Sequence, residues 1–270
     1  MKRILTFILT LTLALSFCVN SFAAATTATA SKTQTGTSEA QTDTSKTQAD
    51  TSEAQTDTSK VQAGASYGIS NLNGAPDIVA ESAVVMDANT GTILYGKEAD
   101  TKRYPASITK VMTALLAVEN CKMSDVITYS NAAVNGIEAG SSTAGINVGA
   151  KLTVEDSLYA LMLVSANEAA AAIAEHISGS TTEFAKLMTK RAKELGCTNT
   201  QFKNPHGLPN EEHYTTAHDM GLILKEAMKH EEFRKISGTI SYTLKKSDTL
   251  KDTLELWNHC LLYTSDAADD

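Results

Sequence analysis

The sequence of 270 residues predicts an α+β protein in which a β-hairpin precedes a block of helices. Two β-rich runs between residues 82 and 95 flank an Asp-Ala-Asn-Thr-Gly segment, which is typical of a hairpin. Further along, apolar residues recur at helical spacing behind Ser and Thr caps. A hydrophobic content of 42% is enough for one sizeable core with a subdomain.

The N-terminal residues 1–25 have the pattern of a signal peptide. Lys2 and Arg3 precede an apolar run at residues 4–19, and small residues suited to signal peptidase follow at 21–25. A membrane anchor is the alternative, but the run is shorter than the ~20 residues that span a bilayer. We therefore expect export to the extracellular, cell-wall face of the cytoplasmic membrane. Phe17 before Cys18 is too bulky for a lipidation site.

Residues 26–73 are rich in Thr, Ser, Ala, Gln, Asp and Lys and contain few large apolar side chains. The ten residues 37–46 recur intact at residues 51–60. Such a tract buries too little surface to offset its ordering entropy, and a coiled coil would need apolar heptad positions that are missing. We expect a disordered linker.

Five helices are expected in the globular part, which we place at residues 78–259. Ser/Thr caps with an acidic residue three positions later predict three of the starts, and Gly196 predicts one stop. The five helices are expected from Ser107 to about residue 119, from the Thr153 cap, over residues 168–177, from the Ser180 cap, and from the Thr216 cap to about residue 228.

Charge and cysteine content exclude several classes of function. The formal net charge of -8 and the absence of a Lys/Arg cluster argue against nucleic-acid binding. Within the globular part, Cys121 and Cys197 are too few for a disulfide framework, and two unrelated thiols are favoured over a pair. The Cys and His spacings match no metal-site pattern, so we expect no metal and no cofactor.

A Ser-x-x-Lys motif, Ser107 to Lys110, follows Pro105, which favours a helix start. Ser107 would then lie in the first turn, where free N–H groups favour developing negative charge. Lys110 lies one turn on, on the same face as the apolar residues Val111 and Ala114. Burial against them would lower its pKa toward that of a general base. A capping serine with a solvated lysine is the alternative.

The Ser-x-Asn motif from Ser165 to Asn167 is the second candidate. It lies between an apolar helical run and the next expected helix, so a tight interhelical turn is expected. Ser-x-x-Lys and Ser-x-Asn each occur once in the chain. Turn formation alone is the alternative explanation of Ser165.

Together the two motifs resemble the penicillin-binding protein and serine β-lactamase superfamily, and further stretches resemble its D-alanyl-D-alanine carboxypeptidase branch, peptidase S11. The resemblance implies an antiparallel sheet packed with helices plus a helical subdomain. It also implies a substrate, the peptidoglycan stem peptide ending in D-Ala-D-Ala, and β-lactam inhibitors. The stretches that carry it lie at residues 85–91, 103–107, 152–156, 204–208 and 214–219.

The resemblance also implies the roles of the site residues. Ser107 would be the nucleophile and Lys110 its general base, with the Ser107 N–H as an oxyanion donor. Ser165 would pass a proton to the leaving D-alanine, and Asn167 would orient Lys110 and bind the substrate amide. His206 is expected to be a structural loop residue.

The sequence departs from the family pattern because it contains no Lys-Thr-Gly. That strand would bind the substrate carboxylate and supply the second oxyanion N–H. We interpret residues 260–270 as a non-native tail and expect the family's C-terminal strands to be missing, which predicts a poorly folded, nearly inactive fragment of an active parent. Membrane contact is expected only through a C-terminal anchor, which many relatives carry.

Two other functions stay open from the residues alone. A class A β-lactamase shares both motifs but needs a Glu-x-x-Leu-Asn string after Asn167, and none follows. A non-catalytic cell-wall-binding protein on a disordered stalk is the other. Turnover of a β-lactam and acylation by a penicillin distinguish the three.

Overall fold

The computed structural model describes residues 78–259, which belong to one compact unit. The predicted signal peptide, linker and tail lie outside the described residues. No helix in residues 78–259 is long and apolar enough to cross a membrane. The elements are β1 (Ala83–Met86), β2 (Ile93–Lys97), the 3-10 turn η1 (Ala106–Thr109), α2 (Lys110–Asn120), β3 (Val126–Thr128), α3 (Asn131–Asn135), β4 (Lys151–Thr153), α4 (Val154–Leu163), α5 (Asn167–Ser178), α6 (Thr181–Glu194), α7 (Ala217–Ala227), α8 (Glu231–Ser237), β5 (Ser241–Leu244) and β6 (Leu254–Trp257).

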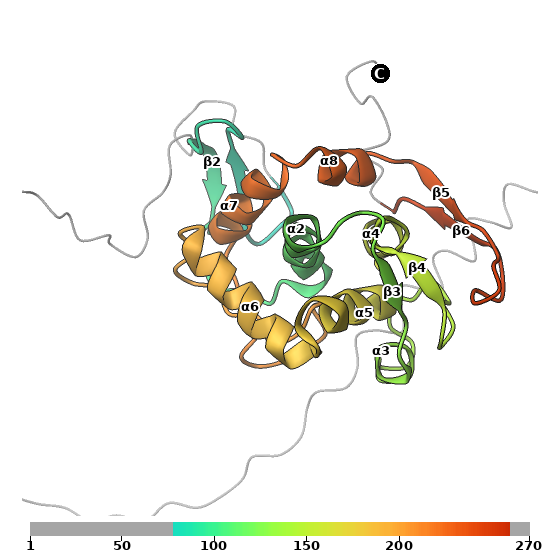
Figure 1. Cartoon of the computed structure of the whole chain (residues 1–270). Helices are drawn as coiled ribbons and strands as arrows, with labels where there is room; N and C mark the ends of the chain where they lie inside the picture. The colour runs from blue at the N-terminus through green and yellow to red at the C-terminus, as the bar shows by residue number, and fades with distance from the viewer. Residues whose placement is uncertain (1–77, 260–270) are drawn as a thin grey trace, which may run out of the picture. The chain divides into compact units, whose positions relative to one another are not determined.

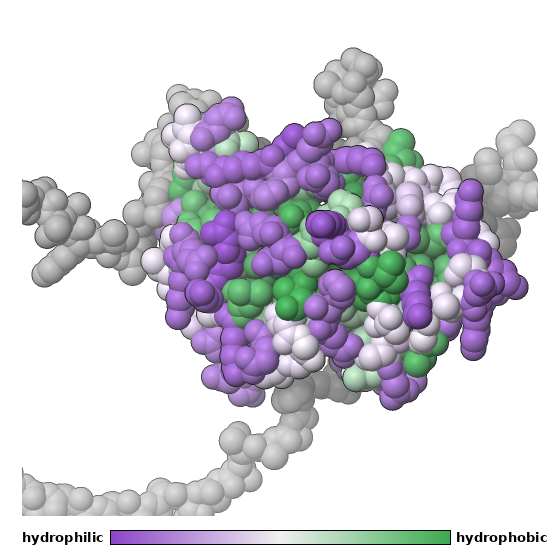
Figure 2. Space-filling model, in the orientation of Figure 1, coloured by the Kyte–Doolittle hydropathy of each residue, from purple (hydrophilic) through white to green (hydrophobic). Residues whose placement is uncertain are grey.

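Helix α2 lies at the centre of the fold and contacts α4, α5, α6, α7 and α8 (Figure 1). Its residues Met112, Leu115 and Leu116 are at most 1% exposed. On the face shown in Figure 2, hydrophilic residues cover much of the surface and hydrophobic residues show between them. The helix that carries Lys110 is therefore held by packing on most of its sides, which fixes the direction of its side chains.

The strands of residues 78–259 form three antiparallel pairs: β1 with β2, β3 with β4, and β5 with β6. The first pair confirms the predicted hairpin and packs on α7, where Gly221 lies against Val84 and Met86. The other two pairs were not predicted. The second of them, β5 with β6, forms a hairpin after the last helix of the described residues.

Side-chain caps confirm the predicted starts of three helices. Thr153 and Asp156 form a reciprocal capping box at α4. Ser180 accepts from the Glu183 N–H at α6, and Thr216 accepts from the Asp219 N–H at α7. The helices α3 and α8 were not predicted, because they are short and carry little hydrophobic periodicity.

The start of the first long helix differs from the prediction. Ser107 lies in η1, and the α-helix begins only at Lys110. The chain enters η1 through Ala106, whose φ of 49° is in the left-handed region. This bend breaks the regular helix before Lys110, so Ser107 is on a tight turn rather than in the first turn of the α-helix.

Candidate active site

The structure brings Ser107, Lys110 and Asn167 together at the adjoining N-terminal ends of α2 and α5. Lys110 Nζ lies 3.3 Å from Ser107 Oγ, 2.7 Å from Asn167 Oδ1 and 3.0 Å from the backbone oxygen of His206. Lys110 is 3% exposed, whereas Ser107 is exposed. An ammonium group has three N–H donors, and these three oxygens accept all of them.

This environment changes the acid–base behaviour of Lys110. Burial lowers the pKa of its amine to about 8, as the sequence predicted in direction. A neutral amine keeps two N–H groups, and two of its three partners, Asn167 Oδ1 and the His206 carbonyl, can only accept. Its lone pair then faces Ser107 Oγ, which is the geometry for removing the hydroxyl proton.

Glu168 opposes this loss of charge and also shapes the site. Its carboxylate favours the charged form of Lys110 and so raises the pKa of that amine. The carboxylate oxygen Oε1 accepts from Thr143 Oγ1 and from the backbone N–H groups of residues 144–146 at 2.7–3.4 Å. Since Glu168 follows Asn167 directly, one helix start both holds Lys110 and anchors the loop before β4. The sequence analysis missed Glu168.

The loop at residues 204–208 supports the turn that carries Ser107. Gly207, with a φ of 85°, lies so close to Ala106 that a Cβ atom would be 1.8 Å from the Ala106 carbonyl oxygen. Thr113 Oγ1 donates to the Pro205 carbonyl at 2.6 Å. The loop therefore contacts the turn before Ser107, the amine of Lys110 and the next turn of α2. His206 acts here through its backbone, in agreement with the structural role expected of it.

A buried histidine, His213, also supports the turn that carries Ser107. His213 is 2% exposed, and burial lowers its pKa to about 4, so its ring is neutral at pH 7. Its Nδ1 accepts from the Lys203 N–H at 3.3 Å, which leaves the ring proton on Nε2. Nε2 then donates to Thr109 Oγ1, 3.0 Å away. Thr109 lies between Ser107 and Lys110, so this bond fixes the backbone that joins them.

Ser165 lies in the predicted turn between α4 and α5, with a φ of 57°. Its Oγ is buried and has no hydrogen-bond partner among the described residues. It is not one of the groups bonded to Lys110. A left-handed backbone at a residue other than glycine, together with a buried hydroxyl left unpaired, is costly and is found at functional sites more than elsewhere. The role of Ser165 stays a prediction.

A cavity of about 620 Å³ opens in front of Ser107. Ser107, Asn167 and His206 line it. The other lining residues come from the segment before Ser107, the loop before β4 and the loop after His206: Tyr104, Ala106, Gly140, Ser141, Ser142, Gly207, Leu208, Pro209, Asn210 and Glu211. Asn167 N donates to Ser142 O at 3.0 Å, which ties the loop before β4 to the start of α5. The volume suits a short peptide.

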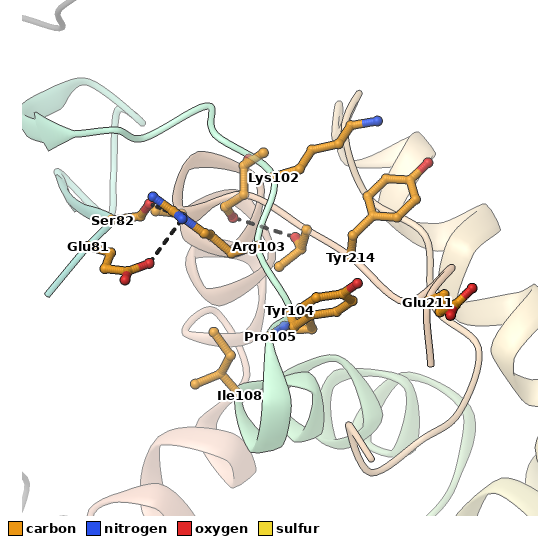
Figure 3. A pocket seen from close by; sticks show the side chains of 12 residues that line it. Glu81, Ser82, Lys102, Arg103, Tyr104, Pro105, Ile108, Glu211 and Tyr214 are labelled. Carbon is orange, nitrogen blue, oxygen red and sulfur yellow. Dashed lines mark hydrogen bonds and ion pairs between the residues drawn. The ribbon is translucent and has the colours of Figure 1, made fainter. Parts of the chain in front are cut away.

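A second cavity of about 670 Å³ is lined by residues at positions 81–82, 102–108 and 211–217 (Figure 3). Ile108 lines it instead of Ser107, and Arg103 pairs with Glu81 at 3.0 Å and bonds Ser82 at its rim. Although it is the larger of the two, it is lined by none of the groups bonded to Lys110. The chemistry is therefore assigned to the cavity at Ser107.

Comparison with known proteins agrees with this geometry. The D-alanyl-D-alanine carboxypeptidase family model, peptidase S11, matches residues 70–269. D-alanyl-D-alanine carboxypeptidase DacF of Bacillus subtilis is 42% identical over 177 residues, which cover 64% of this chain and 45% of DacF. DacA of Haemophilus influenzae is 33% identical over 68% of this chain and 48% of its own length. The chain thus spans about half the length of these relatives.

Solved structures show the same fold. The crystal structure of the Streptomyces K15 DD-transpeptidase has a TM-score of 0.66 and 34% identity, and the match covers 72% of this chain and 79% of that one. Penicillin-binding protein 5 of Haemophilus influenzae has a TM-score of 0.63 at 31% identity, over 70% and 55% of the two chains. The predicted α+β fold of the penicillin-binding type is thereby confirmed. The chain belongs to the D-alanyl-D-alanine carboxypeptidase family, peptidase S11, of the serine penicillin-binding proteins.

Proposed function

We propose that the protein is a serine D-Ala-D-Ala carboxypeptidase that acts on peptidoglycan stem peptides and is acylated by β-lactams. One observation carries the proposal: a desolvated amine, Lys110 Nζ, lies 3.3 Å from the exposed hydroxyl of Ser107 and is fixed there by two further acceptors. A weak nucleophile next to a positioned base is the arrangement that covalent catalysis needs. The names of the relatives point to the same substrate.

The steps of the reaction follow from this geometry. Ser107 Oγ attacks the carbonyl carbon of the penultimate D-alanine while its proton passes to neutral Lys110, and the Ser107 N–H stabilises the oxyanion. The C–N bond then breaks, and the leaving amine of the terminal D-alanine takes the proton by way of the Ser165 hydroxyl. Asn167 keeps Lys110 in place and binds the substrate amide. Water hydrolyses the ester, releasing the shortened peptide and restoring Ser107.

Labelling with a fluorescent penicillin tests the nucleophile. In a full-length parent that contains Lys-Thr-Gly, the wild type should form one covalent adduct whose mass equals that of the protein plus the penicillin. Ser107→Ala should form none, whereas Ser141→Ala, a control at another serine of the same cavity, should label like the wild type. Equal labelling of Ser107→Ala would contradict the proposal. Rapid release of hydrolysed penicillin would indicate a β-lactamase, and no adduct at all would indicate a binding protein.

We further propose that the 270-residue chain by itself releases D-alanine far more slowly than its relatives and is less stable than they are. The reason is that the sequence contains no Lys-Thr-Gly motif to hold the substrate carboxylate and complete the oxyanion site. Measurement of D-alanine release from a pentapeptide ending in D-Ala-D-Ala, with DacF of Bacillus subtilis as the reference, tests this. A rate equal to that of DacF would show that the motif is dispensable.

Export also remains a proposal, supported by the basic, apolar and small-residue pattern of residues 1–25. N-terminal sequencing of protein recovered from the cell-wall fraction should give a chain that starts close to residue 26. An intact Met1 on that protein would contradict cleavage.

A further inference from the structure

Three side chains with metal-binding atoms meet at the C-terminal end of α2, which is the end away from Ser107. Cys121 ends α2, Asp125 directly precedes β3, and His176 lies in the last turn of α5. One ligand atom from each lies within 4.8 Å of the other two. Cys121 and Asp125 are half-buried, and His176 is exposed, so solvent can reach the group. His176 is far from Cys121 and Asp125 in sequence, which is why no spacing motif revealed the group.

The electrostatic environment of this three-residue cluster favours a bound cation. Lys110 and Asn167 bond each other at the N-terminal ends of α2 and α5, and Cys121 and His176 meet at the C-terminal ends, so the two helices run side by side in the same direction. Both therefore end at this cluster, where each contributes the partial negative charge of its last carbonyls. Asp125 adds a full negative charge.

We propose that Cys121, Asp125 and His176 bind a Zn²⁺ ion, with water in the fourth position. Thiolate, imidazole and carboxylate are the protein ligands that Zn²⁺ takes, and ligand atoms around a tetrahedral Zn²⁺ lie roughly 3.5 Å apart. The separations of up to 4.8 Å close to that distance by small side-chain rotations. On binding, the thiol releases its proton to solvent and the new bond is between sulfur and zinc, with no change of oxidation state.

The carboxylate of Asp125 is held in place at the cluster, because its Oδ2 accepts from the Lys122 N–H at 2.8 Å.

A second cluster in the described residues, formed by Glu119, Glu226 and His230, provides the contrast. There Arg191 supplies the positive charge: its Nη2 lies 2.7 Å from Glu119 Oε1 and 3.7 Å from Glu226 Oε1. Lys229 Nζ lies 2.5 Å from Glu226 Oε2, so each carboxylate is already paired with a cation and has little to gain from a metal. This cluster is a matched negative control on the same protein.

Metal titration of the full 270-residue chain, free of any affinity tag, tests the proposal. Calorimetry with Zn²⁺ should show one site per chain. Replacement by Co²⁺ should give a thiolate-to-cobalt charge-transfer band, which reports sulfur ligation directly. Cys121→Ser and His176→Ala should each weaken Zn²⁺ binding by about 10–100-fold or more, as loss of groups that support a zinc site does. His230→Ala and Cys197→Ser should bind like the wild type.

Thermal unfolding gives an independent readout. Added Zn²⁺ should raise the melting temperature of the wild type and of His230→Ala and should leave that of His176→Ala unchanged. His176 is exposed, so its replacement keeps the fold even where Cys121→Ser does not. The proposal is overturned if the chain takes up no Zn²⁺ saturably, if the Co²⁺ complex lacks the sulfur band, or if His176→Ala binds as tightly as the wild type. None of these readouts depends on carboxypeptidase activity.

Discussion

Replacing Gly207 by alanine should displace the turn that carries Ser107. The new Cβ atom would lie 1.8 Å from the Ala106 carbonyl oxygen, and contacts of this kind are not found below 3.0 Å, so the two segments must separate by about 1.2 Å. The loop cannot easily yield, because Asn204 accepts from the Gly207 N–H at 2.7 Å and donates to Leu208 O at 2.9 Å. The movement therefore falls on Ala106 and Ser107.

The free-energy cost has two parts that a control separates. A left-handed φ costs an alanine about 1 kcal/mol relative to glycine, and forced overpacking costs a further ~1–3 kcal/mol. Gly149 has a φ of 83° but no atom within 4 Å of its would-be Cβ, so Gly149→Ala carries only the first part. We expect a loss of about 1 kcal/mol for Gly149→Ala and about 2–4 kcal/mol for Gly207→Ala.

Two assays check this pair. Chemical unfolding followed by circular dichroism measures the free energy of unfolding of both variants, and fluorescent penicillin measures the rate of Ser107 acylation. A displacement near 1 Å in the reacting group should slow acylation about 100-fold in Gly207→Ala and leave Gly149→Ala unchanged. If the two variants lose the same free energy and are acylated at the same rate, the loop does not hold the nucleophile turn and the reasoning fails.

Three further predictions concern the amine. Burial lowers the Lys110 pKa to about 8, so the neutral fraction of this amine should rise about tenfold between pH 7 and pH 9. The rate of Ser107 acylation, measured by stopped-flow labelling, should rise with it. A rate that does not change with pH would count against a lysine base. Glu168→Gln should shift the midpoint of that profile to lower pH, since the carboxylate favours the charged amine; a shift to higher pH would reverse the assigned cause. Asn167→Ala should slow acylation about 10–100-fold, because it removes a charge-assisted hydrogen bond of roughly 1.5–3 kcal/mol. The control Asn135→Ala, at an exposed asparagine, should label like the wild type. Equal acylation rates in the two variants would exclude a positioning role for Asn167.

Local signals in the sequence predicted much of the helical part of the fold. The caps at Thr153, Ser180 and Thr216 are interactions over three residues, so both partners can be read directly from the chain. The strand pairs β3 with β4 and β5 with β6 were missed, because short strands of three or four residues carry little alternation and depend on tertiary packing. The 3-10 turn at Ser107 was missed because it depends on the distant Gly207.

The sequence predicted the main residues of the candidate site, but it did not predict all the groups that hold them in place. Ser107, Lys110 and Asn167 meet as the motifs indicated, and the pKa of Lys110 falls as expected. Burial was the predicted cause of this lower pKa and is its largest cause. The groups that hold the amine in place were less predictable, because the His206 carbonyl belongs to a loop almost a hundred residues away. Contacts of that range leave no pattern in a single sequence.

The left-handed backbone of Ser165 sets two selective pressures against each other. A glycine at this position would relieve the backbone strain and remove a buried hydroxyl that no described residue satisfies, so it should make the fold more robust by about 1 kcal/mol. It would also delete the hydroxyl proposed to carry the proton. Directed evolution that selects for thermal stability alone would therefore favour glycine at position 165 and yield stable proteins without activity. Screening for both properties at once is what would keep the serine.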